Sequence, residues 1–339
     1  MVPLARVYRG SRVESFHSGS IAVVDSAGRL LAFAGDPGFV TCIRSAAKPF
    51  QALPLLENGG IEEFDLTPEE IALTCASHGG EAIHVATAAA LLRKGDFDEE
   101  DLMCGAHVPF DDKAAADLRA SGEAPSPLHS NCSGKHAGML LATQVMDLPS
   151  EGYIEPDHPL QEAMHETLAE YAGLARADIP VATDGCGVLA FFLSLHRTAF
   201  AYARLMRSDE DAPSHVVRSM TSFPYHVGGA WTITTPLMQA FGGDLLAKEG
   251  AEGFYAMALS PSLTDRLDVA DDAAIGIAIK IADGSMTRGR NPVILHTLDL
   301  LGVDIASRRD LDRYREWPLR NIAGALVGEV RAEFELEFL

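Results

Sequence analysis

The segment Ile21-Ala-Val-Val-Asp-Ser-Ala-Gly-Arg-Leu-Leu-Ala-Phe-Ala34 contains the pattern that indicates the fold. Two apolar runs, 21–25 and 30–34, flank Ser26-Ala27-Gly28-Arg29, a sequence typical of a tight turn. The runs predict a hairpin, and residues 40–43 predict a further short strand. The first 43 residues are therefore expected to be mainly strand.

Helical signals follow this strand region. Pro49 predicts a helix to about Asn58 that ends at Gly59-Gly60, and Thr67 before Pro68 predicts a capped short helix. Further helices are expected at 82–94, 134–146 (capped by Ser133), 159–172, 194–206 and 291–301. Strands return at 254–259, 275–282 and 327–338.

Strands at both ends with helices between them predict an α/β (α+β) fold, in which one sheet is built from both termini. No low-complexity linker divides the chain. We therefore expect a single catalytic domain over residues 1–339, with the sheet formed by about 1–45 and 250–339 and a helical lobe between.

Composition narrows the class of protein. The chain has 339 residues, 47% of them apolar, and a formal net charge of −21, which opposes binding to nucleic acid and to anionic membranes. No apolar run is long enough to span a membrane, and the first residues lack the apolar region of a signal peptide. Five cysteines, an odd number, favour free or metal-bound thiols in a reducing compartment. A cytoplasmic enzyme acting on a small molecule is expected.

Two serine-containing segments suggest nucleophilic chemistry. In Ser45-Ala-Ala-Lys48 the serine and the lysine share one face of a helical turn, and a serine needs such a neighbouring base to become nucleophilic. Lysine acts as a base only when burial or nearby cations lower its pKa. The pattern is short, and an exposed lysine beside a capping serine is the alternative. The second segment is Cys75-Ala-Ser77-His78-Gly-Gly-Glu81.

Two further loops contain cysteines, Ser130-Asn-Cys-Ser-Gly-Lys-His136 and Thr183-Asp-Gly-Cys-Gly187. Their thiols, with a nitrogen ligand and a water, would suit zinc, although no C-x-x-C pair occurs. The alternative is that both thiols pack as small apolar groups. From the residues alone, His136 is preferred to Lys135 as the nitrogen ligand, since lysine binds metal only as a neutral amine. The candidate ligands are Cys132, Cys186, His136, His129 and Asp184.

Taken together, these segments resemble the Rhizobium-type L-asparaginases of the asparaginase II family. The matching stretches are Arg44-Ser-Ala-Ala-Lys-Pro-Phe-Gln51, Cys75–Glu81, Ser130–Met139, Asp157-His-Pro159, Thr183–Cys186 and Ile275–Gly284. The resemblance implies a fold like that of serine β-lactamases and class-A glutaminases, with an antiparallel sheet, and a homodimer. It implies hydrolysis of L-asparagine to L-aspartate and ammonia through an acyl-enzyme.

The resemblance also assigns roles by position. Ser45 would be the nucleophile and Lys48 its base, while Ser77 would pair with Lys248, for which Lys280 in an expected strand is the competitor. Zn²⁺ would be held by Cys132, Lys135 and Cys186, which replaces His136 as the preferred nitrogen ligand. The substrate would be contacted by Arg44, His136 and Asp184.

One departure from the family pattern occurs at Ala230-Trp231, where a Gly-Glu-Gly-Arg-like turn with an acidic and a basic residue is expected. Two alternatives to an asparaginase therefore remain open. One is a related serine amidohydrolase of the glutaminase or penicillin-recognising type. The other is an inactive homologue that binds zinc or an amino acid.

Overall fold

A computed structural model describes all residues, 1–339, and the chain divides into two compact units. The first, here called the sheet unit, comprises residues 1–46, 192–207 and 244–339. The second, the helical unit, comprises residues 47–191 and 208–243. Since the structure describes two units, the expected single domain stays a prediction.

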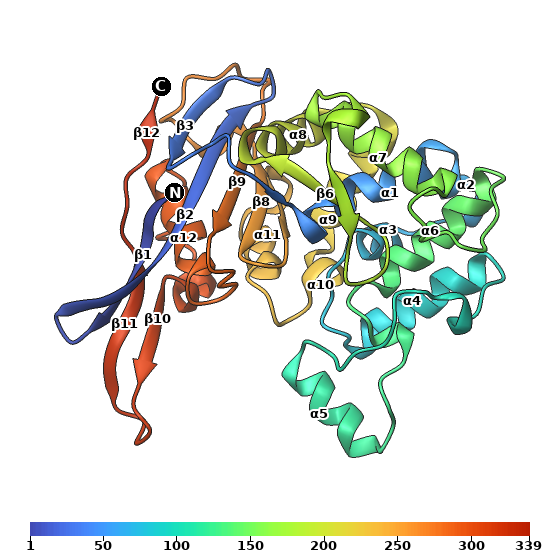
Figure 1. The fold of residues 1–339 in the computed structure, drawn as a ribbon, viewed down its shortest axis with the longest axis horizontal. Coiled ribbons are helices and arrows are strands. Elements are labelled where there is room, and N and C mark those ends of the chain that lie inside the picture. Colours follow the sequence, from blue (N-terminus) through green and yellow to red (C-terminus); the bar gives the residue numbers. More distant parts are fainter. The chain divides into compact units, whose positions relative to one another are not determined.

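The sheet unit contains an antiparallel sheet in the order β10-β11-β1-β2-β9-β8-β7, with β3 pairing with both β2 and β12. Figure 1 shows amino-terminal strands in blue beside carboxy-terminal strands in orange and red. The expected sheet from both termini and the mixed α/β class are therefore confirmed. The strands are β1 (Val2–Arg9), β2 (Arg12–Asp25), β3 (Leu30–Ala34), β7 (Leu245–Glu249), β8 (Phe254–Leu259), β9 (Ile275–Ile281), β10 (Glu316–Arg320), β11 (Leu326–Ala332) and β12 (Glu337–Phe338).

Two long helices of the sheet unit, α8 (Leu195–Arg207) and α12 (Arg290–Leu300), pack against its strands. Helix α8 lies on β2, β8 and β9. It approaches β9 so closely that a Cβ atom at Gly276 would lie 1.7 Å from the carbonyl oxygen of Ala199. Only glycine fits at this position, so the Gly276 backbone sets the distance between helix and sheet.

The carboxy-terminal prediction of one strand over residues 327–338 is wrong. The chain forms β11, leaves the sheet for residues 333–336, and returns as β12 beside β3. Strand β7 was also not expected from the sequence. Its five residues are all buried, so it lacks the alternating pattern that marks a half-exposed strand.

The helical unit has a core built around α1 (Lys48–Glu57), which packs against α6, α7 and α9. Helix α1 continues through Pro54. The other helices are α2 (Gly60–Phe64), α3 (Pro68–Thr74), α4 (Ala82–Lys94), α5 (Asp112–Ser121), α6 (Ser133–Val145), α7 (Pro159–Ala172), α9 (Asp211–Ser222), α10 (Pro224–Gly228) and α11 (Thr234–Phe241).

Short strands complete both units. Strand β4 (Val40–Cys42) pairs with residues 192–194 of β6 (Leu189–Ser194) in the sheet unit, and β5 (Val181–Thr183) pairs with residues 189–191 in the helical unit. No helix of the chain combines the length and the apolar character needed to cross a membrane.

The sequence predicted capping residues for α3 and α6, and the prediction is correct for α3 only. Thr67 forms the predicted cap of α3, accepting from the Glu70 amide in a reciprocal capping box. The predicted Ser133 cap of α6 is wrong, because Cys132 occupies the cap position without a side-chain bond. The Ser133 hydroxyl instead donates to the carbonyl of Leu128, five residues back in the chain.

Candidate active site

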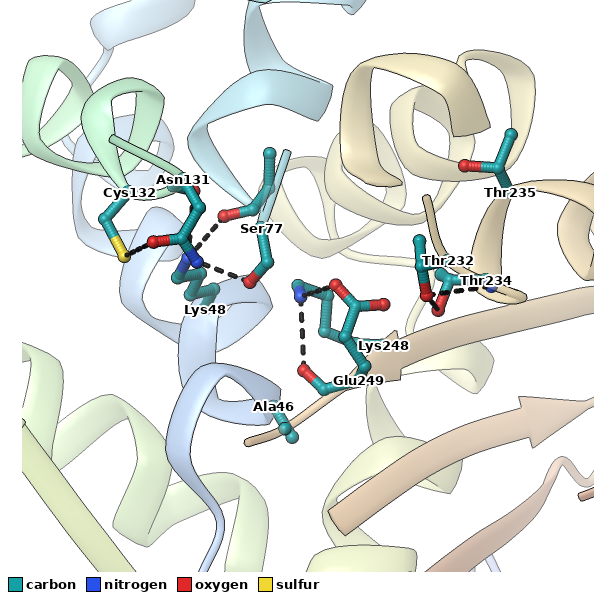
Figure 2. A network of polar contacts seen from close by, with 12 residues as sticks. Ala46, Lys48, Ser77, Asn131, Cys132, Thr232, Thr234, Thr235, Lys248 and Glu249 are labelled. Atoms are coloured by element: carbon teal, nitrogen blue, oxygen red, sulfur yellow. Dashed lines mark hydrogen bonds and ion pairs between the residues drawn. The ribbon is translucent and has the colours of Figure 1, made fainter. Parts of the chain in front are cut away.

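Lys48 is a buried lysine of the helical unit. It is the first residue of α1 and only 1% exposed. Its Nζ donates to the carbonyl of Ala76 at 2.5 Å, lies 3.0 Å from Ser77 Oγ, and is 3.4 Å from the carbonyl oxygen of Asn131 (Figure 2). The start of α1 therefore delivers a buried amine to a serine hydroxyl.

The loop that carries Ser77 is held at several points. The backbone amide of Ser77 donates to the Val227 carbonyl at 3.0 Å, and the Ser77 carbonyl accepts from Trp231 Nε1 at 3.3 Å. The neighbouring His78 accepts at Nδ1 from the Gly80 amide and bonds through Nε2 to Ser133 Oγ at 3.0 Å. Burial first, then the charges of His84 and Lys48, hold the pKa of His78 well below its ordinary value.

The segment that departs from the family pattern lies against this loop. The amide of Ala230 donates to Glu81 Oε1 at 3.0 Å, and Tyr225 donates its hydroxyl proton to the other oxygen of that carboxylate. The Trp231 ring packs against Phe110, with ring centroids 5.1 Å apart. Residues 230 and 231 thus support the Ser77 loop through their backbone and ring.

The two predicted zinc thiols and the predicted lysine ligand lie together in the helical unit. Lys135 Nζ donates to Cys186 Sγ at 3.0 Å. A hydrogen bond from the Cys186 thiol, aided by the charges of Lys48 and Lys135, lowers the pKa of Cys132. Burial acts to lower the pKa of Lys135. The interactions with Cys186 and Cys132 have the larger combined effect, so the pKa of this amine is raised.

These residues meet part of the requirement for zinc. Two adjacent buried sulfur ligands suit this metal. Nowhere in the chain do three or more His, Cys, Asp or Glu side chains form a group able to hold a metal ion. A third protein bond would therefore have to come from Lys135, after loss of the proton that it now donates to Cys186.

His136 lies beside the thiols on the fully buried part of α6 and is 0% exposed. Its Nδ1 lies 2.8 Å from the hydroxyl of Tyr153, and the ring also forms a hydrogen bond with Cys186. Burial is the main cause that lowers the pKa of His136 to about 4. Asp184 is half-buried and heads the turn before Cys186, with its carbonyl accepting from the Gly187 amide at 3.0 Å.

The candidate ligand His129 belongs to the helical unit, where its Nδ1 lies 3.0 Å from Ser126 Oγ, whereas Arg44, Ser45, Lys248 and Lys280 belong to the sheet unit. Ser45 is half-buried in a short 3₁₀ helix, Arg44–Ala47, which follows β4. Arg44 has a φ of 50°, in the left-handed region that costs a non-glycine residue about 1–3 kcal/mol. The strain directly precedes the predicted nucleophile, a location typical of functional sites.

Lys248 and Lys280 also lie in the sheet unit, and both are on strands, β7 and β9. Strand location therefore does not separate these two lysines, contrary to the sequence argument. Lys248 Nζ forms an ion pair with Glu249 Oε1 at 2.7 Å. Lys280 donates to the carbonyl of Glu252, and burial lowers its pKa.

The structure thus brings Lys48 to Ser77, and Lys135 to Cys132 and Cys186, within the helical unit. Sequence reasoning missed Tyr153, which lies in no recognisable motif. It noted Trp231 only as a departure from the family and not as a support of the Ser77 loop.

Comparison with known proteins defines the class. A sequence model of the family described as L-asparaginase II matches residues 5–332, nearly the whole chain. The protein is therefore an amidohydrolase by family. It belongs to the L-asparaginase II family.

Other comparisons add little. No match is found among proteins of curated function. The solved structure described as "Crystal Structure Analysis of Mglu in its native form" aligns over 83% of this chain with 16% identity and a TM-score of 0.42. The chain spans 63% of that protein's length. A likeness of this degree carries no argument, so the relation to β-lactamases and glutaminases stays a prediction.

Proposed function

We propose that the protein hydrolyses the side-chain amide of L-asparagine to L-aspartate and ammonia through an acyl-enzyme built on a serine and a lysine. Membership of the family supports the reaction class. One observation carries the mechanism, the 3.0 Å separation of Lys48 Nζ from Ser77 Oγ inside the helical unit. A serine becomes nucleophilic when such an amine removes its proton.

The chemistry proceeds in two halves. The neutral Lys48 amine takes a serine proton as the oxygen attacks the amide carbon, and the tetrahedral intermediate releases ammonia after it receives that proton. Water then attacks the ester carbonyl and gives a proton to Lys48. Lys48 returns that proton to the serine oxygen as the ester breaks, which releases L-aspartate and restores the serine. Ser77 is within reach of Lys48 for this exchange. Attack by Ser45 remains the prediction from the sequence.

The oxyanion of the intermediate needs hydrogen-bond donors. The Ser77 amide already donates to the Val227 carbonyl, so other groups must supply the donors to the oxyanion. Loss of one such donor typically costs about 3–4 kcal/mol of barrier.

Substitution of each serine tests which one forms the ester. Ser45→Ala and Ser77→Ala are assayed for ammonia release, and the acyl-enzyme is trapped with substrate and located by mass spectrometry. Acylation of the peptide containing residue 45 or 77 identifies the nucleophile. Ser121→Ala, at an exposed serine, serves as the control. Full activity in both single variants and in the double variant would exclude this mechanism.

Substrate choice is tested in the same preparation. Ammonia release from L-asparagine is compared with release from L-glutamine, and nitrocefin cleavage is measured alongside. A preference for asparagine supports the proposal. Dominant glutamine or nitrocefin turnover would reassign the protein to the related serine amidohydrolases. Binding of amino acid without any turnover would indicate an inactive homologue.

Zinc and the dimer are further parts of the proposal. Cys132 and Cys186, with neutral Lys135, would hold Zn²⁺, which when bound supplies a Lewis acid near the ligand. Elemental analysis of the purified protein and of Cys132→Ser tests this, and equal metal content in both would exclude Cys132 as a ligand. Light scattering on the purified chain tests the homodimer, which a monomer mass would contradict.

A further inference from the structure

We propose that His107, Phe110 and Trp231 form an aromatic subsite beside Ser77, which binds an apolar substituent on the side-chain amide nitrogen of the substrate. The protein then hydrolyses N-substituted β-amides of L-aspartate, such as the N-benzyl amide, as well as L-asparagine. The reaction rests on the proposed function. The subsite itself rests only on contacts within the helical unit.

The segment that departs from the family pattern supplies one end of a row of three rings. The centroids of Trp231 and Phe110 are 5.1 Å apart with the planes tilted by 58°, and those of Phe110 and His107 are 4.7 Å apart with the planes 25° from parallel. The central ring, Phe110, is 46% exposed, while the two outer rings are half-buried. An exposed phenyl ring between two supporting rings offers a surface to a further apolar or aromatic group.

Both ends of the row are tied to the loops around Lys48. At one end, Trp231 Nε1 donates to the Ser77 carbonyl at 3.3 Å. At the other end, His107 Nε2 accepts from the Asn131 amide at 2.9 Å. Lys48 Nζ contacts the same two loops, at Ser77 Oγ and at the Asn131 carbonyl (Figure 2). The aromatic subsite therefore lies next to the amine and the hydroxyl that carry the proposed mechanism.

The charge of the surroundings decides which part of the substrate this subsite receives. The ring nitrogen of His107 that accepts a proton donor carries no proton itself, so this ring is uncharged. The neighbouring carboxylates of Glu81 and Asp111 accept from the backbone amides of Ala230 and Ala114. Three uncharged rings therefore form the surface, and the negative faces of aromatic rings disfavour a carboxylate.

The α-carboxylate and the α-ammonium of an amino acid are attached to one carbon, so both charged groups bind away from the rings. The side-chain amide is the uncharged part of L-asparagine that remains. A substituent on the amide nitrogen is consequently the group that the aromatic subsite can bind, and this nitrogen belongs to the bond that is broken.

The reaction needs no reactant besides water. The serine oxygen attacks the amide carbon, and the carbon–nitrogen bond breaks when the nitrogen receives the serine proton from Lys48. Benzylamine leaves in place of ammonia, and water then hydrolyses the ester to L-aspartate. The benzyl ring contacts the subsite until the bond breaks, so its binding also stabilises the transition state.

The first experiment compares the N-benzyl and N-methyl β-amides of L-aspartate. Both release a primary alkyl amine, so the substrates differ mainly in the ring, and kcat/KM is measured from the L-aspartate formed. We expect the wild type to prefer the N-benzyl amide about tenfold and Phe110→Ala to reduce this ratio about three- to tenfold. Phe16→Ala, at a phenylalanine of β2 that is 58% exposed, is the matched control and should keep the wild-type ratio.

The second experiment separates the ring of Trp231 from its hydrogen bond. Trp231→Phe retains an aromatic ring but loses the bond to the Ser77 carbonyl, so kcat/KM should fall by the same factor for both amides. Trp231→Ala loses the ring as well and should also reduce the ratio between them. A residue that only supports the loop would lower both amides equally in either variant.

The outcomes distinguish this inference from the proposed function. In an enzyme that releases ammonia from L-asparagine, three results overturn the aromatic subsite and leave the proposed function intact. These are no turnover of either amide, no wild-type preference for the N-benzyl amide, and a ratio that Phe110→Ala and Trp231→Ala both leave unchanged.

A wild type that releases no ammonia from L-asparagine would defeat the proposed function. Calorimetry with the two amides would then decide the subsite. Tighter binding of the N-benzyl amide that is lost in Phe110→Ala supports it, and equal Kd values for the two amides in the wild type overturn it.

Discussion

Two buried lysines, Lys48 and Lys248, both donate to backbone carbonyl oxygens but differ in a side-chain partner, which is a serine hydroxyl for Lys48 and a carboxylate for Lys248. Lys48, in the helical unit, meets two carbonyl oxygens and the hydroxyl of Ser77. Lys248, in the sheet unit, is 0% exposed and is ion-paired to Glu249 at 2.7 Å. Figure 2 shows both sets of contacts.

The difference bears on what each lysine can do. A carboxylate at contact distance favours the ammonium form of a lysine, and Glu249 lies at such a distance from Lys248. A hydroxyl partner can instead exchange its proton with the amine. We therefore expect Lys48 to act in proton transfer and Lys248 to act as a fixed charge, a different role from that of a second base.

The largest expected effect is on catalysis. Lys48→Met should lower ammonia release from L-asparagine at least about 1000-fold, because it removes the group that takes the serine proton. The measurement is a coupled ammonia assay on protein shown by thermal melting to be folded. Lys113→Met, at an exposed lysine of α5, should be unchanged. Activity within tenfold of the wild type would remove Lys48 from the mechanism.

The second prediction concerns stability. Glu249→Ala leaves the buried Lys248 without this carboxylate and should lower the free energy of unfolding by about 3–5 kcal/mol. Urea denaturation measures this loss, and replacing both residues with Met and Leu should restore most of it. Glu329→Ala, which removes an exposed partner of Arg331, should cost less than about 1 kcal/mol. Similar losses at the two sites would contradict the comparison.

The third prediction uses pH to examine the surroundings of Lys48. The pKa of folded His78 is below 6.5, so the contribution of this histidine to stability is complete above pH 6.5 and declines as pH falls below it. The expected decline is about 1.4 kcal/mol for each pH unit below 6.5. Urea denaturation at pH 7.0 and 5.5 should show a decline to which His136, with its pKa of about 4, also contributes, and His78→Gln should reduce that decline by the share of His78.

A matched variant tests whether this effect belongs to the buried site. His215→Gln, at a half-exposed histidine of α9, should leave the pH dependence intact. Lys48→Met should weaken it, because the charge of Lys48 is one cause of the lowered pKa of His78. An unchanged slope in His78→Gln would refute the assignment.

The smallest expected effect is at the departure from the family pattern. Trp231→Phe removes the hydrogen bond to the Ser77 carbonyl and should lower kcat/KM for L-asparagine about three- to tenfold. The chain has one other tryptophan, Trp317 on β10, which is 40% exposed and provides the control. Equal kcat/KM values for Trp231→Phe and the wild type would show that the Ser77 loop does not depend on this bond.

Much of the fold could be predicted from local sequence. Helices 82–94 and 159–172 have the predicted bounds because the residues that end them, Gly95 and Gly173, follow directly. Strand 254–259 was also found where its apolar run indicated. The hairpin around Gly28 formed because that glycine adopts a φ of 88°, which its turn requires.

Long-range pairing explains the failures. Residues 245–249 form strand β7 because they pair with β8. All five are buried, so their sequence lacks the alternation of apolar and polar residues that would have predicted a strand. Ser133 does not cap α6, and its hydroxyl is hydrogen-bonded to Leu128 and His78 instead. The loop of Tyr153 contains no motif, so its bond to His136 could not be anticipated.

By itself, the sequence determined the ends of helices 82–94 and 159–172, the turn at Gly28 and the family, since these depend on residues near each other in the chain or on their joint presence. Only the tertiary structure decided which group each buried polar atom meets. Lys48 and Ser77 are 29 positions apart, and Lys48 and Asn131 are 83 apart. Contacts over such separations depend on the packing of α1 against its neighbours, which no local pattern encodes.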